Sequence, residues 1–236
     1  MYDYEDDNED LFGDAPTAAT KAQIDFRAEL NDDQYAAVTA PDGPAIVLAG
    51  AGSGKTRTLT YRVAYLLTQG ALPEEILLLT FTNKASREML DRVEHLTGVA
   101  AHQFLGGTFH HVGQKVLRQY GESVGLSSNF TILDDADSDS LLNEVIRDLD
   151  ATFLKDKNNP KAKPLKSLIS YARNLQRSVA EVARERYGDS VPGLASRVEE
   201  FSAAYRQIKL DRGLADFDDL LEFWFEVLQR NEEAVT

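Results

Sequence analysis

Cysteine is absent from this chain of 236 residues, and so are long apolar runs. Without cysteine the chain can form neither disulfides nor thiolate metal sites, which favours a reducing cytosolic setting. No segment approaches the roughly 18 apolar residues of a membrane-spanning helix. The acidic start of the chain is the opposite of a signal peptide. We therefore expect a cytoplasmic protein with no membrane partner.

Basic residues are also scarce, since 25 of them stand against 39 acidic residues and leave a formal net charge of −14. Seven of the acids fall in the first fourteen positions, where no basic residue occurs, so we expect residues 1–22 to form a disordered acidic tail. The opposite bias occurs at 155–177, where the only acid is Asp156. Such a basic island attracts polyanions, although charge alone is equally compatible with a solvated helix face. Its basic residues are Lys155, Lys157, Lys161, Lys163, Lys166, Arg173 and Arg177.

The first part of the chain alternates short apolar runs with helical patterns. Buried strands separated by helices are typical of a parallel sheet in an α/β domain, which we expect over residues 23–109. The expected elements are a helix within 30–40 capped by Asn31, a strand at 45–49, a helix at 55–69 stopped by Gly70, a strand at 75–81, a helix at 83–97 capped by Asn83 and stopped by Gly98, and a strand at 104–109.

Helical periodicity dominates the remainder of the chain. The segment 130–135 could be extended, but we interpret it as a helix entry capped by Asp134 or Asp135. In the basic segment, Lys166, Ser170, Arg173 and Arg177 share a face that we expect to point outward, away from the apolar stripe. The expected helices cover 110–124, 136–149, 165–177, 179–187 and 194–212, and a last amphipathic helix opens with the acids after Ala215.

A glycine-rich stretch joins the first apolar run to the helix that follows it. The phosphate-loop pattern asks for glycine, four residues, and then Gly-Lys-Ser/Thr, and here alanine replaces the first glycine. Backbone N–H groups of such a loop turn toward the phosphates of a nucleotide, the lysine reaches the β and γ phosphates, and the threonine hydroxyl ligates Mg²⁺. The loop residues are Ala49, Gly50, Ala51, Gly52, Ser53, Gly54, Lys55 and Thr56.

Four segments in order resemble one family, the UvrD/Rep/PcrA-type superfamily 1 DNA helicases. "LNDDQ" resembles the Q motif, "AGAGSGKT" motif I, "LLLTFTNKASREM" motif Ia and "GTFHH" motif Ib, and "LADFDDLL" resembles the segment before the DExQ motif. The likeness covers residues 24–225. It implies a RecA-like P-loop domain with a parallel sheet, interrupted by an all-helical insertion at 110–213 and resumed at 214–236.

The resemblance assigns nucleotide contacts beyond the phosphate loop. Gln34 resembles the glutamine that reads the adenine edge, and Arg57 resembles an arginine near the base and sugar. Lys55 and Thr56 would then be the catalytic pair for ATP, with Thr56 holding Mg²⁺ through the nucleotide. Without the resemblance, Gln34 and Arg57 would be read as exposed helix residues.

The resemblance also assigns contacts to single-stranded DNA. Phe81 resembles the aromatic residue that stacks on a base. Position 111 is histidine where the family usually has serine, so His111 receives no role, and a metal site at the two histidines lacks further ligands. The other DNA contacts implied are Thr80, Thr82, Asn83, Lys84, Thr108, Phe109 and His110.

The implied activity is that of the ATP-binding N-terminal part of a 3′→5′ DNA helicase acting on single-stranded DNA and its junctions with duplex. We find no acidic strand end to orient water, so we expect a chain that stops before the DExQ strand, lacks its C-terminal helicase domains and is inactive alone. A non-catalytic module that binds nucleotide and single-stranded DNA, or one half of a split helicase, is the alternative.

Overall fold

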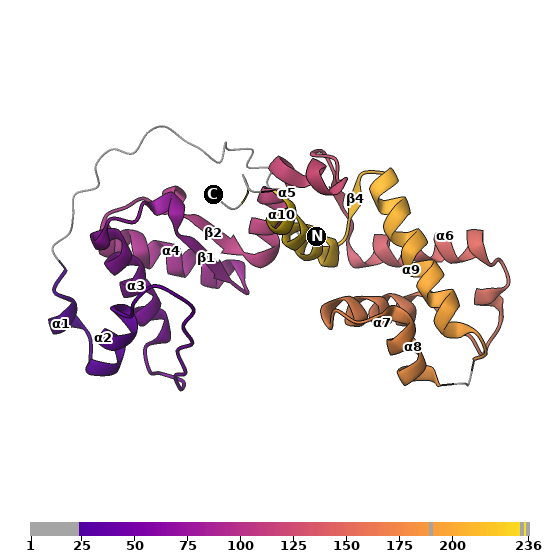
Figure 1. The fold of residues 1–236 in the computed structure, drawn as a ribbon, viewed down its shortest axis with the longest axis horizontal. Coiled ribbons are helices and arrows are strands. Elements are labelled where there is room, and N and C mark those ends of the chain that lie inside the picture. The colour runs from indigo at the N-terminus through magenta and orange to yellow at the C-terminus, as the bar shows by residue number, and fades with distance from the viewer. Residues whose placement is uncertain (1–23, 189–190, 232–233, 235–236) are drawn as a thin grey trace. The chain divides into compact units, whose positions relative to one another are not determined.

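The structure is a computed structural model that describes residues 24–188, 191–231 and 234. Contacts divide the chain into two units, Met1–Phe109 and His110–Thr236, which we describe one at a time (Figure 1). The domain boundaries expected from the sequence stay predictions. The segment 214–236 clusters with the helical unit, and its assignment to the nucleotide-binding domain stays a prediction. The acidic tail at 1–22 lies outside the described residues.

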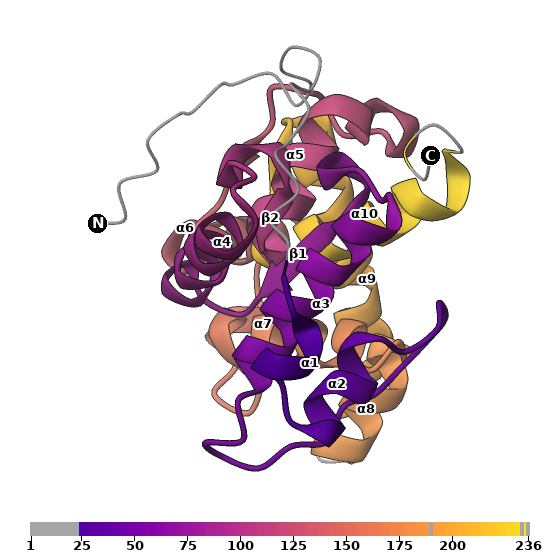
Figure 2. The same ribbon diagram turned by 90° about the vertical axis from the view of Figure 1, so that its left-hand side faces the viewer.

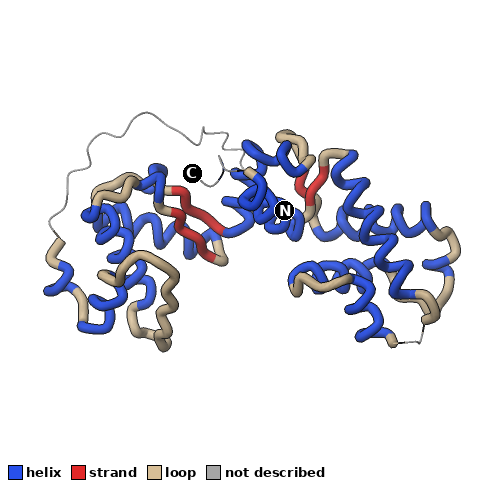
Figure 3. The backbone as a smooth tube through the Cα atoms, viewed as in Figure 1, coloured by secondary structure: helices blue, strands red, loops and turns tan. Residues whose placement is uncertain are grey.

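The first unit contains a two-stranded parallel sheet flanked by helices (Figure 3). Leu77 lies opposite Leu105 and Thr80 lies opposite Thr108, so both strands end at the same edge. Since each strand is followed at once by a helix, the residues after Thr80 and Thr108 are brought together at that edge. The elements are α1 Phe26–Glu29, α2 Asp32–Val38, α3 Lys55–Gln69, β1 Leu77–Thr80, α4 Asn83–Thr97 and β2 Leu105–Thr108, with 3-10 turns at Pro73–Glu75 and Ala101–Gln103.

The core of this unit lies where α3 and α4 meet the strands. Figure 2 shows α2 beside α3, and α2 contacts that helix. α4 contacts both strands, and at Gly106 it comes so near that a Cβ would lie 2.9 Å from a methyl carbon of Leu90. Burying each large apolar side chain contributes about 1.5–3 kcal/mol. The buried residues of this core are Val63, Ile76, Leu78, Met89, Val93, Val99 and Phe104.

The strand expected at 45–49 does not form, and that prediction is wrong in this structure. The segment has no regular secondary structure, and Ile46 and Leu48 are 88% and 92% exposed. A strand needs a hydrogen-bonded neighbour, and in the described part of this unit β1 and β2 pair only with each other. The apolar pattern shows that the segment contains strand-type residues, but it does not show whether a neighbouring strand is available to pair with it.

The second unit is nearly all helical, with one short parallel strand pair that places Thr131 opposite Leu214. One core lies among α6, α7, α8 and α9, and a second lies between α5 and α10. At Gly113, α5 comes so near α10 that a Cβ would lie 3.1 Å from the carbonyl oxygen of Leu220. The elements are α5 Phe109–Tyr120, β3 Thr131–Ile132, α6 Asp135–Leu149, α7 Ala162–Asn174, α8 Val179–Tyr187, α9 Leu194–Asp211, β4 Leu214–Ala215 and α10 Phe217–Arg230, with 3-10 turns at Gly121–Val124 and Phe153–Lys155.

Most helix ends match the local signals in the sequence. Asp134 caps α6 by accepting from the backbone N–H of Asp137 at 2.8 Å, and Asp216 caps α10 in the same way. The cap expected at Asn83 is wrong, because Thr82 accepts from the N–H of Ala85 at 3.2 Å and Asn83 is the first residue of α4. Threonine and asparagine are both good caps, and the turn after β1 selects the threonine.

Candidate functional site

The glycine-rich loop, residues 49–54, leads into an open helix start. Gly54 occupies the N-cap position of α3 with a left-handed φ of 84°, and no side chain caps the helix. The ammonium of Lys55 donates to the carbonyl oxygens of Ala49 and Gly50, at 3.0 and 2.7 Å. The first turn of α3 carries no acidic residue. Its positive end is therefore free to meet an anion.

Gln34 is fixed beside this loop. Its side chain forms a capping box with Asn31 at the start of α2, and its amide Nε2 donates to the carbonyl oxygen of Ser53 at 3.1 Å. A Cβ on Gly54 would lie 2.7 Å from that nitrogen, so glycine serves both the backbone angle and the close approach. The structure thus brings the predicted glutamine against the predicted loop.

Arg57 is anchored to residues that sequence reasoning missed. Its guanidinium donates to a carboxylate oxygen of Glu29 at 2.7 Å and to the hydroxyl of Tyr61 at 3.2 Å. Burial and the hydrogen bond with Glu29 raise the pKa of Tyr61 above its ordinary value. The spacing of four residues on one helix could have revealed Tyr61. Nothing in the local sequence points to Glu29, which lies 28 positions away.

Thr56 fits the role of a magnesium ligand by its donor chemistry. It is exposed on the first turn of α3, and within the described part of the chain its hydroxyl makes no hydrogen bond. A hydroxyl is the hard oxygen donor that Mg²⁺ accepts, with phosphate oxygens and water completing the shell. Its backbone carbonyl accepts from the hydroxyl of Thr60 at 2.9 Å.

The carboxyl edge of the sheet carries two phenylalanines. Phe81 is 91% exposed, and its ring lies 5.6 Å from that of Phe109. The hydroxyl of Thr80 donates to the carbonyl of Thr82 at 3.1 Å, which fixes the turn between β1 and α4. An exposed ring on a rigid turn is suited to stacking on a flat partner.

The other residues expected to contact DNA have different surroundings. Asn83 and Lys84 are exposed on the first turn of α4, and Lys84 lies 3.9 Å from Glu88. Thr108 closes β2 at the same edge of the sheet. His110 lies in the second unit and meets the ring of Phe217 edge-on at 5.5 Å.

The prediction that α7 carries an outward basic face is wrong, because acids of the chain pair with its cations. The ammonium of Lys166 lies 2.7 Å from a carboxylate oxygen of Asp135, and Arg177 binds Glu185 at 2.5 Å. Arg173 is largely buried. Helical periodicity separated these cations from the apolar stripe correctly. However, acids of α6 and α10 pair with Lys166 and Arg173, and acids of α8 pair with Arg177, which stays exposed; the sequence does not show those contacts.

Arg173 belongs to a buried ion cluster that joins α7, α9 and α10. It donates to Asp219 at 2.7 Å and Glu222 at 2.6 Å, while Lys209 donates to Asp216 at 2.5 Å and also pairs with Asp219. Burial alone would raise the pKa of Asp216, but Lys209 and Arg173 outweigh it and lower the pKa to about 2. Burial raises the pKa of Asp219. The cluster fixes how these helices pack.

The geometry defines a class of protein: a mixed helix-and-strand chain with a glycine-rich loop opening a helix, a small parallel sheet and a helical second unit. Residues 30–236 match the family model described as the UvrD/REP helicase N-terminal domain. The chain belongs to the UvrD/REP helicase family and corresponds to its N-terminal portion.

Known relatives agree with this assignment. The chain is 37% identical over 205 residues to an "ATP-dependent DNA helicase PcrA" of Leuconostoc citreum, covering 85% of this chain and 26% of the relative. Proteins of the same name from Staphylococcus epidermidis and Staphylococcus aureus are 35% and 34% identical over 207 residues, or 87% of this chain and 27% of each relative. The chain thus spans about a quarter of their length. Among the described residues, no helix has the length and apolar character needed to cross a membrane.

Proposed function

We propose that this chain is the ATP-binding N-terminal part of an ATP-dependent DNA helicase that moves 3′→5′ along single-stranded DNA. The open start of α3, with Lys55 held at the glycine-rich loop, is the observation that carries the proposal. Family membership and the names of the relatives support the same conclusion. In this proposal the first unit is RecA-like, residues 110–213 form a helical insertion, and residues 214–236 return to the RecA-like domain.

Nucleotide binding follows from the groups around the loop. Lys55 exchanges its bonds to two backbone carbonyls for stronger, charge-assisted bonds to the β and γ phosphates, and uncapped amides of α3 add to them. Thr56 would hold Mg²⁺ through its hydroxyl, and the ion would neutralise phosphate charge. Gln34 presents its amide toward the adenine edge, while Arg57 lies on the same side, near base and sugar.

Single-stranded DNA would lie at the carboxyl edge of the sheet. Phe81 stacks on a base, with Phe109 behind it, and the turn at Thr80 and Thr82 holds the ring in place. Backbone amides at the start of α4 and the exposed Lys84 face the phosphates, while Asn83 and Thr108 complete the contact within the first unit. In this arrangement the ring of Phe81 stacks on a base, while the backbone amides of α4 and the ammonium of Lys84 bind phosphates.

Turnover requires a carboxylate that orients water and holds Mg²⁺. In the described chain, the acids that follow β3 and β4 are already engaged, since Asp134 caps α6 and Asp216 is both cap and partner of Lys209. We therefore expect this chain to bind ATP without hydrolysing it. Its partners would be the C-terminal helicase domains, which supply the missing groups.

Titration of a fluorescent ATP analogue with Mg²⁺ tests the nucleotide site. Replacing Lys55 with alanine removes a charge-assisted bond to phosphate, worth about 1.5–3 kcal/mol, so affinity should fall roughly 10- to 100-fold. Lys84→Ala is the matched control, because that lysine is exposed in the same unit but lies on the first turn of α4, beside Glu88. Equal losses in the two variants, or none in Lys55→Ala, would contradict the proposal.

A further inference from the structure

Arg57 is held by one nitrogen of its guanidinium, which leaves the other nitrogens open. Its Nη2 donates to the carboxylate of Glu29 at 2.7 Å, to the backbone carbonyl of Glu29 at 2.9 Å and to the hydroxyl of Tyr61 at 3.2 Å. Among the described residues, no acceptor bonds to Nε or Nη1 of this exposed side chain. The anchored guanidinium therefore still has N–H donors to offer a ligand.

Glu29, Arg57 and Tyr61 form a closed set of hydrogen bonds. The hydroxyl of Tyr61 donates to the carboxylate of Glu29 at 3.1 Å while it accepts from Arg57. The guanidinium also lies over the ring of Tyr61, 4.8 Å from its centroid. Tyr61 is buried in a small core with Leu30 and Val38, so packing fixes the position of its hydroxyl. Glu29 and Tyr61 together restrict the orientation of Arg57.

One short stretch of chain holds both Arg57 and the glycine-rich loop. Glu29 is the last residue of α1, and Gln34 lies in the first turn of α2, where its amide donates to the carbonyl of Ser53. A Cβ on Gly54 would lie 2.7 Å from Nε2 of Gln34 and 3.9 Å from Cβ of Arg57, so these three residues are close neighbours. The glutamine expected at the adenine edge and the arginine expected near base and sugar therefore have a common support.

We propose that Glu29 is a positioning residue for the nucleotide and acts through Arg57. It holds the guanidinium where the open nitrogens can donate to the sugar or the base, so the side chain need not be ordered when the nucleotide binds. The carboxylate also balances the charge of the arginine, which keeps the guanidinium from moving to the phosphates that Lys55 binds. This inference rests on the proposed function and adds a further residue to the same site.

Calorimetric titration with two ligands tests this role: ATP, and inorganic tripolyphosphate, which has phosphates but neither sugar nor base. Both are titrated with Mg²⁺. Glu29→Ala should weaken ATP binding roughly 2- to 10-fold, the range expected for a typical hydrogen bond, and leave tripolyphosphate binding unchanged. Glu29→Gln keeps an acceptor oxygen and should recover part of the loss. Unchanged ATP affinity in Glu29→Ala, or equal losses for both ligands, overturns the proposal, because damage to the loop itself would weaken both.

A double-mutant cycle shows whether Glu29 acts through Arg57. In an Arg57→Gln background, Glu29→Ala should cause no further loss of ATP affinity, because no guanidinium remains to be positioned. Asp42→Ala is the matched control, since Asp42 is an exposed acid of the same unit that lies 3.6 Å from a different arginine, Arg62. It should leave both affinities unchanged. A full additional loss from Glu29→Ala in the Arg57→Gln background overturns the proposal.

Lys55→Ala separates this inference from the proposed function. That variant should weaken the binding of both ligands, because Lys55 contacts phosphate in the proposed function. If Lys55→Ala affects neither ligand while ATP affinity still depends on Glu29 through Arg57, the proposed phosphate site is wrong and the positioning role stands. If Lys55→Ala weakens both ligands while Glu29→Ala leaves their relative affinity unchanged, only the positioning role is wrong.

Discussion

Lys55 in the first unit and the buried ion cluster in the second unit use their charges in opposite ways. In the first unit, Lys55 is exposed and held only by backbone carbonyls, which a ligand can replace without stranding a charge. In the second unit, Lys209 and Arg173 are buried against Asp216, Asp219 and other acids. Removing any one of these residues would leave its partner as a buried charge with fewer counterions. A basic residue that is buried against acids of the chain is therefore not available to a ligand, whereas an exposed one such as Lys55 is.

This difference has an energetic origin. A buried charge loses several kcal/mol of hydration, so a buried pair is stable only when every member keeps its partners. An exposed charge keeps most of its hydration and contributes little to the stability of the fold. It can therefore still interact with a ligand. We expect substitutions in the ion cluster to change stability, and substitutions near the loop and the sheet edge to change binding.

The largest effect is expected from Asp219→Ala. It leaves Lys209 without its second carboxylate in a fully buried site, which should cost roughly 3–5 kcal/mol in the free energy of unfolding. The sequence has a single tryptophan, Trp224 on α10, so its fluorescence in a urea titration reports the second unit alone. Asp218→Ala, next along the chain but outside the cluster, is the control. If both variants lose equal stability, the cluster does not hold the helices.

Acid should weaken the second unit in a defined range. The pKa of Asp216 is about 2 in the folded chain, below its ordinary value of 3.8, so its ionised form favours folding. Its contribution, about 2 kcal/mol, is complete above pH 4 and is lost as the pH falls toward 2. Unfolding followed by Trp224 at several pH values measures this loss. Asp216→Asn should flatten the dependence, and an equal slope in that variant would assign it to other groups.

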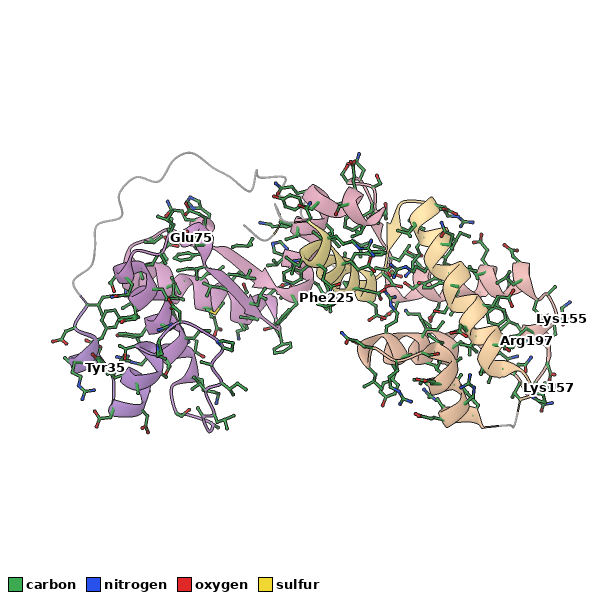
Figure 4. All side chains as sticks on the ribbon, in the orientation of Figure 1. Tyr35, Glu75, Lys155, Lys157, Arg197 and Phe225 are labelled. Carbon is green, nitrogen blue, oxygen red and sulfur yellow. The ribbon has the colours of Figure 1, made fainter. Side chains whose placement is uncertain are left out.

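Phe81→Ala should reduce affinity for a single-stranded oligonucleotide by about 1–3 kcal/mol, because it removes a stacking ring. Fluorescence anisotropy of a labelled oligonucleotide measures the effect. Phe225→Ala removes a ring that is also exposed, but in the second unit, and should leave affinity unchanged (Figure 4). A similar loss in both variants would show that general apolar contact, and not the sheet edge, binds the strand.

The smallest effect is expected from Arg177→Gln. Its pairs with Glu181 and Glu185 are exposed to solvent, and such pairs contribute little to stability. The urea midpoint followed by Trp224 should therefore shift little, and high salt should remove even that shift. A loss as large as that of Asp219→Ala would mean that exposure does not separate the two kinds of ion pair.

Local signals in the sequence predicted the helices well. The bounds of α3 follow from its apolar spacing and from Gly70, which ends the helix with a left-handed φ of 104°. Asp134 and Asp216 acted as caps because an acid before a helical pattern can bond to the free N–H groups a few residues on. The arrangement at the loop also follows from local sequence, since its three glycines and Lys55 all fall within residues 50–55.

Contacts between distant residues could not be predicted in the same way. The apolar pattern at 45–49 predicted a strand but gave no information on its neighbour. The face of α7 was read as outward because the acids that cover Arg173 come from α10, 46 and 49 positions later. Glu29 beside Arg57 was missed for the same reason. Ion pairs between residues far apart in the chain depend on how the helices pack, and a single sequence does not show that packing.

The exposed segment at 45–49 has a consequence for how the chain behaves at high concentration. It consists of apolar residues only, with no charge and no proline, and Ile46, Val47 and Leu48 all face solvent. Short uncharged segments with strand-type residues readily pair with copies of themselves. Molecules of this chain should therefore begin to cluster at this point, immediately before the loop that holds Lys55. A lysine at position 47 should keep them apart by repulsion, a change visible by light scattering.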